Sequence, residues 1–463
     1  MGEVFYAGEN KKRPGVYYRV DRSDEAAADS LLGVCGCVFK ADYGPLNEVV
    51  EVTRENYAQV FGTELTADVL KYLFLGGAST VMACRIGDGG TPSSVTLTGT
   101  GTITSKYVGA KTFSVKVRER LGDASLKEII IYDGTKIFEK YVIEAGGDEA
   151  SALAAAMAAS RNFSFTKTAG AGDNEITGVE QEEFTPGTNP NATATTSYSA
   201  GFKALEGRKM NVLVVDNEDP AVHVLLQAFI QSLADNVRFT MAVVTEKTSH
   251  TLTYETKMEN AAGFNDPYMV YILNPYLMVN GNKIDGYQTA ALAAGLISSY
   301  PCRYSMTHKV LDAASEILEN VPNSILNAAP LSGCIALTLS SDKKVWLDCG
   351  VNTLVDPPGD MDDGWKTIRR VKTRAELMER TLSAIESLIG NVDNDSTGRA
   401  TVVTVAQGVI NSMIAEGSLS SGNAYVSTEE QPNGNTAYFG MNIVDKESVE
   451  KIYFTFRFQF SVN

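Results

Sequence analysis

The sequence has few of the side chains that usually carry chemistry. Histidine occurs three times in 463 residues, as His223, His250 and His308. None of them has a second histidine or a cysteine at the spacing of a zinc site. The chain also has neither a Gly-x-Ser-x-Gly turn nor a phosphate-binding loop. We therefore expect no catalytic residue, no metal site and no cofactor.

Positive charge and long apolar runs are scarce as well. The 40 Lys and Arg residues are outnumbered by 56 Asp and Glu residues, for a formal net charge of −16. Nucleic-acid binding needs clustered basic side chains, so we predict no nucleic-acid partner. No run of about 18 apolar residues is present, so we expect no direct membrane insertion. Residues 1–12 are polar and unlike a signal peptide, which predicts assembly in the cytoplasm of the producing cell.

The six cysteines have the surroundings of reduced, buried thiols. Most lie in apolar stretches, and no Cys-x-x-Cys pair occurs. In a strand, Cys35 and Cys37 would point to the same face. We therefore expect neither a redox nor a metal role for them. They are Cys35, Cys37, Cys84, Cys302, Cys334 and Cys349.

What is present is an ordinary globular composition, with 44% apolar and 21% charged residues. A chain of 463 residues is too long for one compact core, which stops growing at roughly 250–300 residues. We predict an α+β multidomain fold with a discontinuous core. Its parts are an extended N-terminal arm (1–20), an α/β core (21–90 and 200–356), an inserted antiparallel β domain (91–199) and an α+β C-terminal domain (357–463).

Strand and helix signals alternate through the predicted core, as in sheets covered by helices. Thr53 and Thr66 are placed to cap short helices, and residues 309–319 read as a further helix. In the C-terminal domain, apolar residues form one helical stripe over 377–389 and another over 402–413. These stripes predict two amphipathic helices, which end at Gly390 and Gly417.

The last residues alternate between apolar and polar side chains more regularly than any other segment. Tyr453, Thr455, Arg457, Gln459 and Ser461 share the polar face of the predicted strand. This strand is either an internal strand of the last domain or a strand that joins a sheet of another subunit. The apolar face consists of Ile452, Phe454, Phe456, Phe458, Phe460 and Val462.

The N-terminus contains a second strand-like segment, which makes pairing with another subunit the more attractive interpretation. A Pro-Gly turn signal is followed there by β-branched and aromatic residues. An isolated strand must pair with something, because unpaired backbone groups are costly. The residues assigned to this inter-subunit arm are Arg13, Pro14, Gly15, Val16, Tyr17, Tyr18 and Val20.

Two charged clusters allow alternative interpretations. Asp216 and Asp219 follow a predicted strand, where the acids of an α/β hydrolase or nucleotide-binding enzyme could lie. Asp219 and Pro220 also suit a helix start, which is the simpler interpretation. The basic run Arg369, Arg370, Lys372 and Arg374 is either a solvated helix start or a contact with an acidic neighbouring protein.

The order of several short motifs resembles the contractile tail sheath family of phages of Gram-positive hosts and of phage tail-like particles. The matching motifs are spread over nearly the whole chain. They are Arg13-Pro-Gly-Val-Tyr17, Tyr43-Gly-Pro45, Tyr57-Ala-Gln-Val-Phe-Gly62, Phe74-Leu-Gly-Gly77, Thr102-Ile-Thr-Ser-Lys-Tyr-Val-Gly109, Cys349-Gly-Val-Asn-Thr-Leu354, Trp365-Lys-Thr-Ile-Arg-Arg-Val371, Gly390-Asn-Val-Asp393 and Val449-Glu-Lys-Ile-Tyr453. After Gly109 the family's usual Gly-Thr-Arg-Gly-Asn is replaced by Gly109-Ala-Lys-Thr-Phe113.

The resemblance implies a structural, non-enzymatic protein without a cofactor. It implies a homopolymer of hexameric rings around an inner tail tube, with baseplate and tail terminator proteins as further partners. The terminal arms would add strands to a neighbour's C-terminal sheet, and contraction would drive the tube through a cell envelope. The resemblance places the protein in the tail of a virion or of a tail-like particle, with Arg369, Arg370, Lys372 and Arg374 as candidate tube or neighbour contacts.

Overall fold

The computed structural model describes residues 3–4, 17–18, 32–168, 175–192, 195–359 and 361–459. The chain divides into two compact units, residues 1–31 and residues 32–463. In the first unit, strands β1 (Glu3–Val4) and β2 (Tyr17–Tyr18) pair in parallel, with Glu3 opposite Tyr17. All further description concerns the second unit.

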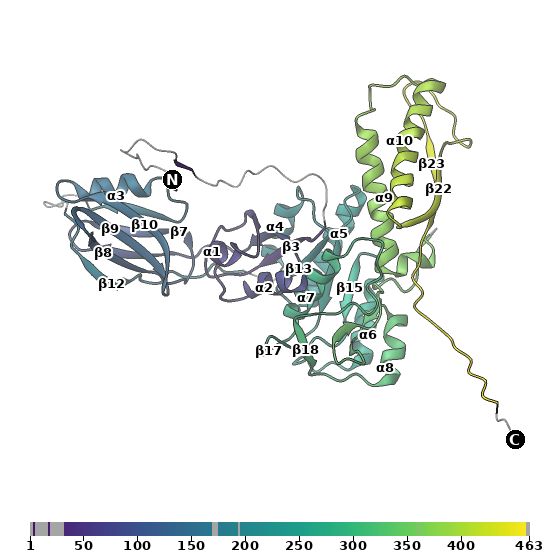
Figure 1. Cartoon of the computed structure of the whole chain (residues 1–463), viewed down its shortest axis with the longest axis horizontal. Coiled ribbons are helices and arrows are strands. Elements are labelled where there is room, and N and C mark those ends of the chain that lie inside the picture. Colours follow the sequence, from purple (N-terminus) through teal and green to yellow (C-terminus); the bar gives the residue numbers. More distant parts are fainter. Residues whose placement is uncertain are drawn as a thin grey trace. The chain divides into compact units, whose positions relative to one another are not determined.

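A seven-stranded sheet forms the centre of the second unit, in the order β19-β15-β14-β13-β3-β5-β4. Six strands run parallel, and β4 is antiparallel to β5 (Figure 1). Most of their side chains are buried, as expected for a sheet covered on both faces. The strands are β3 (Val34–Phe39), β4 (Val49–Val52), β5 (Thr80–Arg85), β13 (Val212–Val215), β14 (Met241–Thr245), β15 (Met269–Ile272) and β19 (Cys334–Ile335).

Helices cover this sheet, and one of them is itself almost completely enclosed. Helix α7 (Tyr287–Ser299) is buried from Thr289 to Ser298 and crosses α2 (Asp68–Gly76) closely. A Cβ atom on Gly76 would lie 2.1 Å from the carbonyl oxygen of Leu292, so this crossing requires glycine. The other helices are α1 (Tyr57–Phe61), α4 (Thr196–Leu205), α5 (Pro220–Asp235), α6 (Tyr254–Phe264), α8 (Asn323–Ala328) and the 3₁₀ turn η1 (Ala329–Ser332).

Small antiparallel sheets accompany the core, and one of them corrects the sequence analysis. The helix expected at 309–319 is wrong, because this segment contains β18 (Ala314–Ile317), which pairs with β16 (Leu277–Val279). Burial of Ala314 and Ile317 against the core outweighs the local helix preference of the sequence. The remaining strands are β17 (Asn282–Ile284), β20 (Leu337–Leu339) and β21 (Val345–Leu347).

Two antiparallel sheets and one helix lie between β5 and α4 in the chain, in the region of the predicted β insertion. The sheets have the orders β10-β9-β8-β12 and β11-β7-β6. Between them lies a cluster of buried aromatic and aliphatic side chains centred on Phe113. The elements are β6 (Pro92–Leu97), β7 (Gly101–Val108), β8 (Ser114–Arg120), β9 (Asp123–Asp133), β10 (Lys136–Glu144), α3 (Glu149–Met157), β11 (Phe163–Lys167) and β12 (Val179–Glu183).

A buried arginine holds the turn that joins the core to this aromatic cluster. The Arg85 guanidinium donates hydrogen bonds to the carbonyl oxygens of Ala41 and Gly44, at 2.9 and 2.7 Å. Between these two residues, the ring of Tyr43 packs edge-on against those of Phe113 and Tyr107. Burial lowers the pKa of Arg85 to about 10, which leaves it charged at neutral pH. Satisfied backbone carbonyls therefore fix the direction in which Tyr43 enters the cluster.

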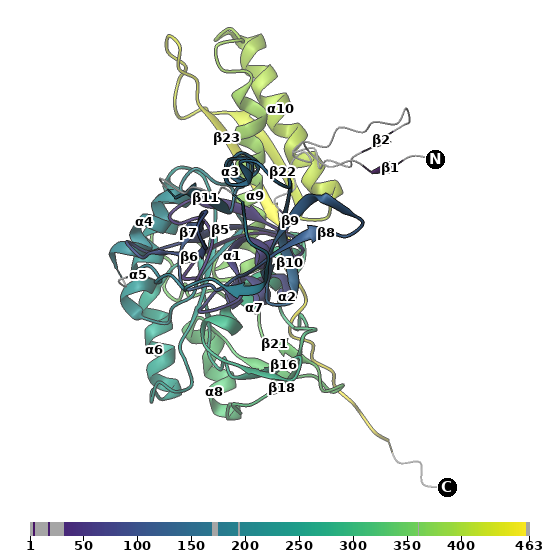
Figure 2. The same cartoon turned by 90° about the vertical axis from the view of Figure 1, so that its left-hand side faces the viewer.

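The C-terminal part consists of two long helices and a two-stranded hairpin (Figures 1 and 2). Helices α9 (Ile368–Glu386) and α10 (Ser396–Ala415), which the two apolar stripes predict, pack together. The hairpin strands β22 (Leu419–Val426) and β23 (Phe439–Asp445) follow, and the 3₁₀ turn η2 (Asp363–Lys366) precedes α9. A small buried cluster joins these elements to the core; it contains Cys302, Leu377, Ile410, Met413 and Leu419.

Other expectations can be compared with the structure directly. The mixed α+β multidomain class is confirmed by the several sheets and helices. The cysteines are free thiols, all buried except the half-buried Cys349. Thr53 and Thr66 do not cap helices, because the N-cap positions are Asn56 and Ala67. Within the described ranges, no helix is long and apolar enough to cross a membrane.

Candidate assembly interface

The hairpin of β22 and β23 presents one half-covered face and one exposed face. In its register, Asn423 lies opposite Asn442 and Ala424 opposite Met441. The two asparagines are exposed, whereas Ala424 and Met441 are half-buried and pack on the small cluster under the hairpin. This alternation follows from the two-residue period of a strand. A sheet of two strands is marginal by itself, so the hairpin depends on the helices beneath it and has room for further strands.

The segment after the hairpin is extended and exposed. Residues 451–459 form no helix or strand, and each of them is exposed. Phe454, Phe456 and Phe458 are 77%, 75% and 92% exposed, and Ile452 is 67% exposed. The interpretation as an internal strand of the last domain is therefore wrong for these residues. Phe460, which was assigned to the same apolar face, lies outside the described residues.

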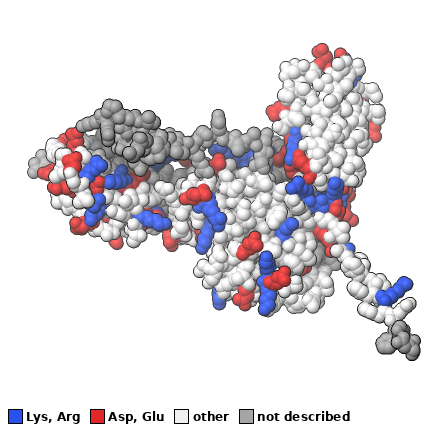
Figure 3. Space-filling view, in the orientation of Figure 1, with Lys and Arg blue, Asp and Glu red and all other residues white. Residues whose placement is uncertain are grey.

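This segment starts from a fixed point on the subunit. The Glu450 carboxylate accepts hydrogen bonds from the Ser305 and Thr307 hydroxyls, both at 2.8 Å. The Ser448 hydroxyl accepts one from Arg369 at 2.7 Å. After these anchors the chain extends freely, and Figure 3 shows it without acidic side chains among the described residues. An anchored base, followed by an extension that is apolar on one face and carries no acidic side chain, is the form expected of an arm that pairs elsewhere.

The N-terminal arm is described only in part. Tyr17 and Tyr18 form β2, which pairs with β1. The other residues assigned to this arm, Arg13, Pro14, Gly15, Val16 and Val20, lie outside the described residues. Their role in an inter-subunit contact stays a prediction.

The basic run of α9 has acidic partners within the same chain. Arg370 binds the Asp445 carboxylate through two nitrogens, at 3.0 and 2.8 Å, and Arg374 donates to the same carboxylate at 2.8 Å. Arg374 also forms a two-point pair with Asp362, at 2.7 and 3.0 Å. Burial alone would raise the pKa of Asp445, but the hydrogen bonds from Arg370 and Arg374 lower it below its usual value. These pairs tie the end of the hairpin to the start of α9.

Two further basic side chains of α9 are withdrawn from the surface, Arg369 fully and Lys372 in part. Lys372 donates to the carbonyl oxygens of Ile297 and Tyr300, at 2.7 and 2.5 Å, and so binds the carboxyl end of α7. Burial lowers the pKa of Lys372 to about 8. Arg369 is 7% exposed and holds Ser448. The contact with a tube or neighbour expected of these residues stays a prediction, but much of their charge is already engaged within the subunit.

The acidic cluster at Asp216 belongs to a hydrogen-bond network within the core. The buried Asp216 carboxylate accepts hydrogen bonds from the backbone N–H of Lys40 at 2.8 Å and from the hydroxyls of Tyr198 and Thr66. The Lys40 ammonium also lies 2.8 Å from it. Asp219 accepts from the Ala221 N–H and caps α5, as the simpler interpretation predicts. Both carboxylates therefore have a structural use, and Asp216 has no oxygen left open to a substrate.

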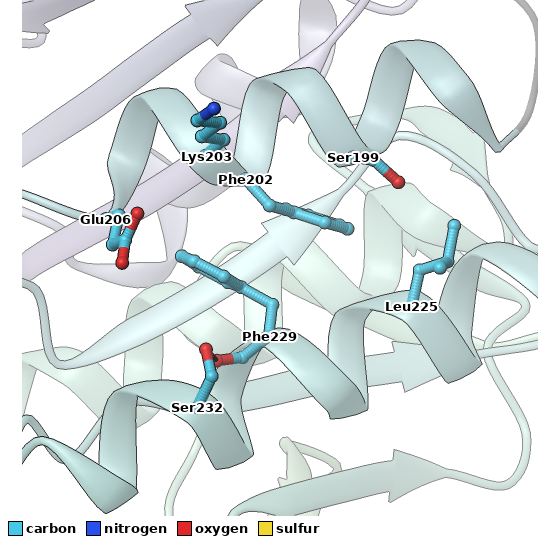
Figure 4. A pocket seen from close by; sticks show the side chains of 7 residues that line it. All are labelled: Ser199, Phe202, Lys203, Glu206, Leu225, Phe229 and Ser232. Atoms are coloured by element: carbon cyan, nitrogen blue, oxygen red, sulfur yellow. Dashed lines mark hydrogen bonds between the residues drawn. The ribbon is translucent and has the colours of Figure 1, made fainter.

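A hollow lies between α4 and α5, as Figure 4 shows. It measures about 250 Å³ and is lined on one side by the stacked rings of Phe202 and Phe229. Its polar side chains are Ser199, Lys203, Glu206 and Ser232, which include neither a histidine base nor a metal-ligand set. No three such ligands come together elsewhere among the described residues. The candidate site of this protein is therefore its C-terminal assembly surface.

Sequence reasoning predicted an arm but missed the attachments at its base. Asp445, Ser305 and Thr307 show no motif, and their partners lie far away in the chain. The one available signal was the basic run in an acidic protein, which requires acidic partners somewhere. Choosing among the 56 acidic residues needs the three-dimensional fold.

Comparisons with known proteins identify the central domain and the fold. Residues 191–348 match the family model described as the phage tail sheath protein central domain, and no curated protein sequence matches the chain. The solved sheath tail protein of Desulfitobacterium hafniense is 15% identical, with a TM-score of 0.71 over 93% of this chain and 100% of that chain. The sheath tail protein of Listeria innocua is 18% identical, with a TM-score of 0.68 over 89% and 95%. The helical sheath of the anti-feeding prophage in its contracted state is 10% identical, with a TM-score of 0.56 over 97% and 99%. Residues 191–348 therefore match the central domain of phage tail sheath proteins, and the chain has the fold of tail sheath proteins.

Proposed function

We propose that this protein is the structural subunit of a contractile tail sheath. The subunits polymerise as stacked hexameric rings around an inner tube, and contraction of the polymer drives the tube through a cell envelope. The family match of residues 191–348 and the likeness to a contracted helical sheath support this role. The observation that carries the proposal in this chain is segment 451–459, whose alternating phenylalanines are exposed on the isolated subunit.

The exposed phenylalanines supply the energy of a subunit contact. Full burial of a large apolar side chain contributes about 1.5–3 kcal/mol. Ile452, Phe454, Phe456 and Phe458 together would contribute roughly 6–12 kcal/mol before the entropic costs of association. A strand added to the two-stranded hairpin of another subunit would bury this face and pair the backbone at the same time.

The anchored arm also suits a polymer that changes shape. A paired strand resists pulling, because all its backbone hydrogen bonds would have to break together. The residues between the Glu450 anchor and the paired phenylalanines could meanwhile change direction. Neighbouring subunits would then stay joined while their bulky parts rotate and gain contacts. Each subunit is a structural element that links its neighbours, and its role includes no catalytic step.

The partners follow from this role. The first is a second copy of the chain, and the others are an inner tube protein, a baseplate and a tail terminator. A solved relative matched over 97% of this chain belongs to the baseplate of the anti-feeding prophage. We propose the same particle context here, in the tail of a virion or of a tail-like particle that is assembled in the cytoplasm of the producing bacterium.

Electron microscopy of the purified protein at high concentration tests the proposal. Striated hollow tubes are expected from the full chain, alone or with its tube protein. A chain that ends after Lys451 keeps the Glu450 anchor, so it should fold normally and form no tubes. Removal of residues 1–20 should block tube formation as well. Long striated tubes from both truncated chains would overturn the arm mechanism.

Point variants separate the two faces of the arm. Replacement of Phe454, Phe456 and Phe458 by serine should abolish polymerisation, because it removes the buried face of the added strand. Replacement of Tyr453, Thr455 and Arg457 by serine is the matched control, because it changes equally exposed residues of the opposite face. The control should still polymerise. Equal loss in both variants would contradict a face-specific contact.

A further inference from the structure

The alternation of hydrogen-bonded pairs in the hairpin defines which backbone N–H and C=O groups point away from the partner strand. The Ser427 N–H donates to the Tyr438 carbonyl oxygen at 2.8 Å, so these two residues form a hydrogen-bonded pair. Such pairs alternate along an antiparallel ladder. Counting along the register, Asn423 pairs with Asn442 in the same way. Gly422 and Ala424 therefore direct their N–H and C=O groups away from β23, toward the outer edge of β22.

A side chain of α10 occupies that outer edge. The Gln407 amide oxygen accepts a hydrogen bond from the Ala424 N–H at 2.9 Å. Its amide nitrogen donates to the Gly422 carbonyl oxygen at 3.2 Å. It donates in addition to the Asn411 side chain at 3.0 Å, which fixes the orientation of the amide. One primary amide thus makes the two contacts that a neighbouring strand would make with these residues.

The outer edge of β23 is different. By the same alternation of hydrogen-bonded pairs, Met441 and Ile443 direct their backbone N–H and C=O groups away from β22. Among the described strands, β22 is the only neighbour of β23. Beneath the hairpin, α9, α10 and β23 line an apolar hollow of about 180 Å³, with side chains that include Ile385, Val402 and Met441. An unpaired edge beside apolar cover is a ready acceptor for an amphipathic strand.

We propose that Gln407 closes the edge of β22, so that the C-terminal segment of a second copy adds to the edge of β23. The inference rests on the proposed strand exchange and goes further, because it names the acceptor edge and the residue that excludes the other one. An added strand next to β23 turns Phe454, Phe456 and Phe458 toward the apolar hollow. Its polar face, with Thr455, then lies on the same side as the exposed Asn442.

Disulfide trapping between two copies tests the choice of edge. One copy carries a cysteine at Tyr453, Thr455 or Arg457, and the other carries Asn442→Cys on β23 or Asn423→Cys on β22. The two asparagines are matched, because they lie opposite each other on the same exposed face. A disulfide requires Cα atoms within about 7 Å, whereas the strand beyond a neighbour lies about 9.6 Å away. The native thiols are buried apart from Cys349, which Cys349→Ser removes.

The expected result is a disulfide-linked dimer with Asn442→Cys for one of the three arm positions, and none with Asn423→Cys. Dimers with Asn423→Cys in the otherwise native chain would overturn the inference and leave strand exchange standing. Absence of dimers with either strand, together with absence of tubes, would instead overturn the proposed function. In a chain that carries both the arm cysteine and Asn442→Cys, a disulfide that migrates as a monomer would show that the arm folds back on its own hairpin, which contradicts both.

Variants at Gln407 test the closing role directly. Gln407→Ala frees the Gly422 carbonyl and the Ala424 N–H, so dimers with Asn423→Cys should become detectable. Gln407→Glu keeps the shape and the acceptor but cannot donate to Gly422, and it should give the same change more weakly. Unchanged circular dichroism shows that both variants are folded. Trapping that stays restricted to Asn442→Cys in Gln407→Ala would show that Gln407 does not close the edge.

Discussion

The β insertion buries phenylalanine side chains, whereas the C-terminal part exposes them. In the insertion, Phe113 is 2% exposed and contacts the rings of Phe138, Phe163 and Phe184 at 5.0–5.8 Å between centroids. In the C-terminal segment, Phe454 and Phe456 lie next to each other but are more than 70% exposed. The insertion buries its aromatic rings within one chain, whereas we propose that the C-terminal part is completed by a segment of another chain.

The two regions also differ in how they attach to the core. The insertion receives Tyr43 from the core side into its aromatic cluster, on a turn that is held by hydrogen bonds from Arg85, which stays charged at neutral and acidic pH. The C-terminal part is joined by a small apolar cluster and by charge pairs around Asp445. Apolar attachment is insensitive to pH, but charge pairs depend on it. The difference predicts that acid weakens the attachment of the C-terminal part more than the attachment of the insertion.

The sharpest way to break this comparison is to truncate one phenylalanine in each region. Phe113→Ala should lower the free energy of unfolding of the insertion by about 3–5 kcal/mol, because it leaves a cavity among packed rings. Phe456→Ala should change stability by less than about 0.5 kcal/mol, because its ring has little to lose in the isolated subunit. Hydrogen exchange of peptides from β8 and β9, together with urea unfolding, measures both. Equal destabilisation would mean that the C-terminal segment packs on its own subunit.

Removal of the charge pair should have the next largest effect. Asp445→Asn deprives Arg370 and Arg374 of a shared, mostly buried carboxylate, and we expect a loss of about 1–3 kcal/mol in the local stability of the hairpin. Asp363→Asn is the control, because its pair with Lys366 is at the surface. Hydrogen exchange of residues 439–445 gives the readout. Protection that survives Asp445→Asn would show that the apolar cluster alone holds the hairpin.

The same pair predicts a response to acid. The folded-state pKa of Asp445 lies below its ordinary value, so the pair contributes its full stability above about pH 4, the unfolded value. The contribution is lost as the pH falls through the folded pKa, when the carboxylate takes up its proton. Hairpin protection should decline over that acidic range, and Asp445→Asn should remove this part of the pH dependence.

The sequence predicted the parts of the fold that depend on local patterns. The parallel strands, the α9 and α10 stripes and the cap at Asp219 were predicted because periodicity and capping are short-range properties. The helix expected at 309–319 was wrong, because strand pairing with β16 is a long-range contact that the local pattern does not contain. The domain boundaries stay predictions.

The candidate site could be predicted to a similar depth. The alternation of the last segment revealed an amphipathic arm, since that pattern is written in consecutive residues. The acceptor edge could not be predicted, because it depends on an amide of α10 that meets two backbone groups of β22. The partners of the basic run were missed for the same reason. Asp445 becomes a partner of Arg370 only once the hairpin has folded onto α9.

A further effect is expected at the same end of α9, where Lys372 meets α7. Its folded pKa of about 8 is below the ordinary lysine value, so the folded protein releases this proton at lower pH than the unfolded chain does. Stability should therefore rise with pH between about 8 and 10.5, by at most about 1.4 kcal/mol per pH unit. Lys372→Met should remove this rise, as measured by urea unfolding across that range. Lys366→Met, at the surface, should leave it unchanged, and an unaltered rise in Lys372→Met would assign it to another group.

The smallest effect is expected at Leu382, and it sharpens the comparison most. The helical stripe of α9 contains both Leu377 and Leu382, but Leu377 is 7% exposed and Leu382 is 51% exposed. Leu377→Gln should destabilise the C-terminal part by about 2–3 kcal/mol or more, because it buries an amide in an apolar cluster. Leu382→Gln should cost less than about 0.5 kcal/mol in the isolated subunit. If tube formation is lost in Leu382→Gln at unchanged stability, this face of α9 is a second contact between subunits. Unchanged tube formation would mean that the contacts of the C-terminal part with other subunits are limited to the hairpin and segment 451–459.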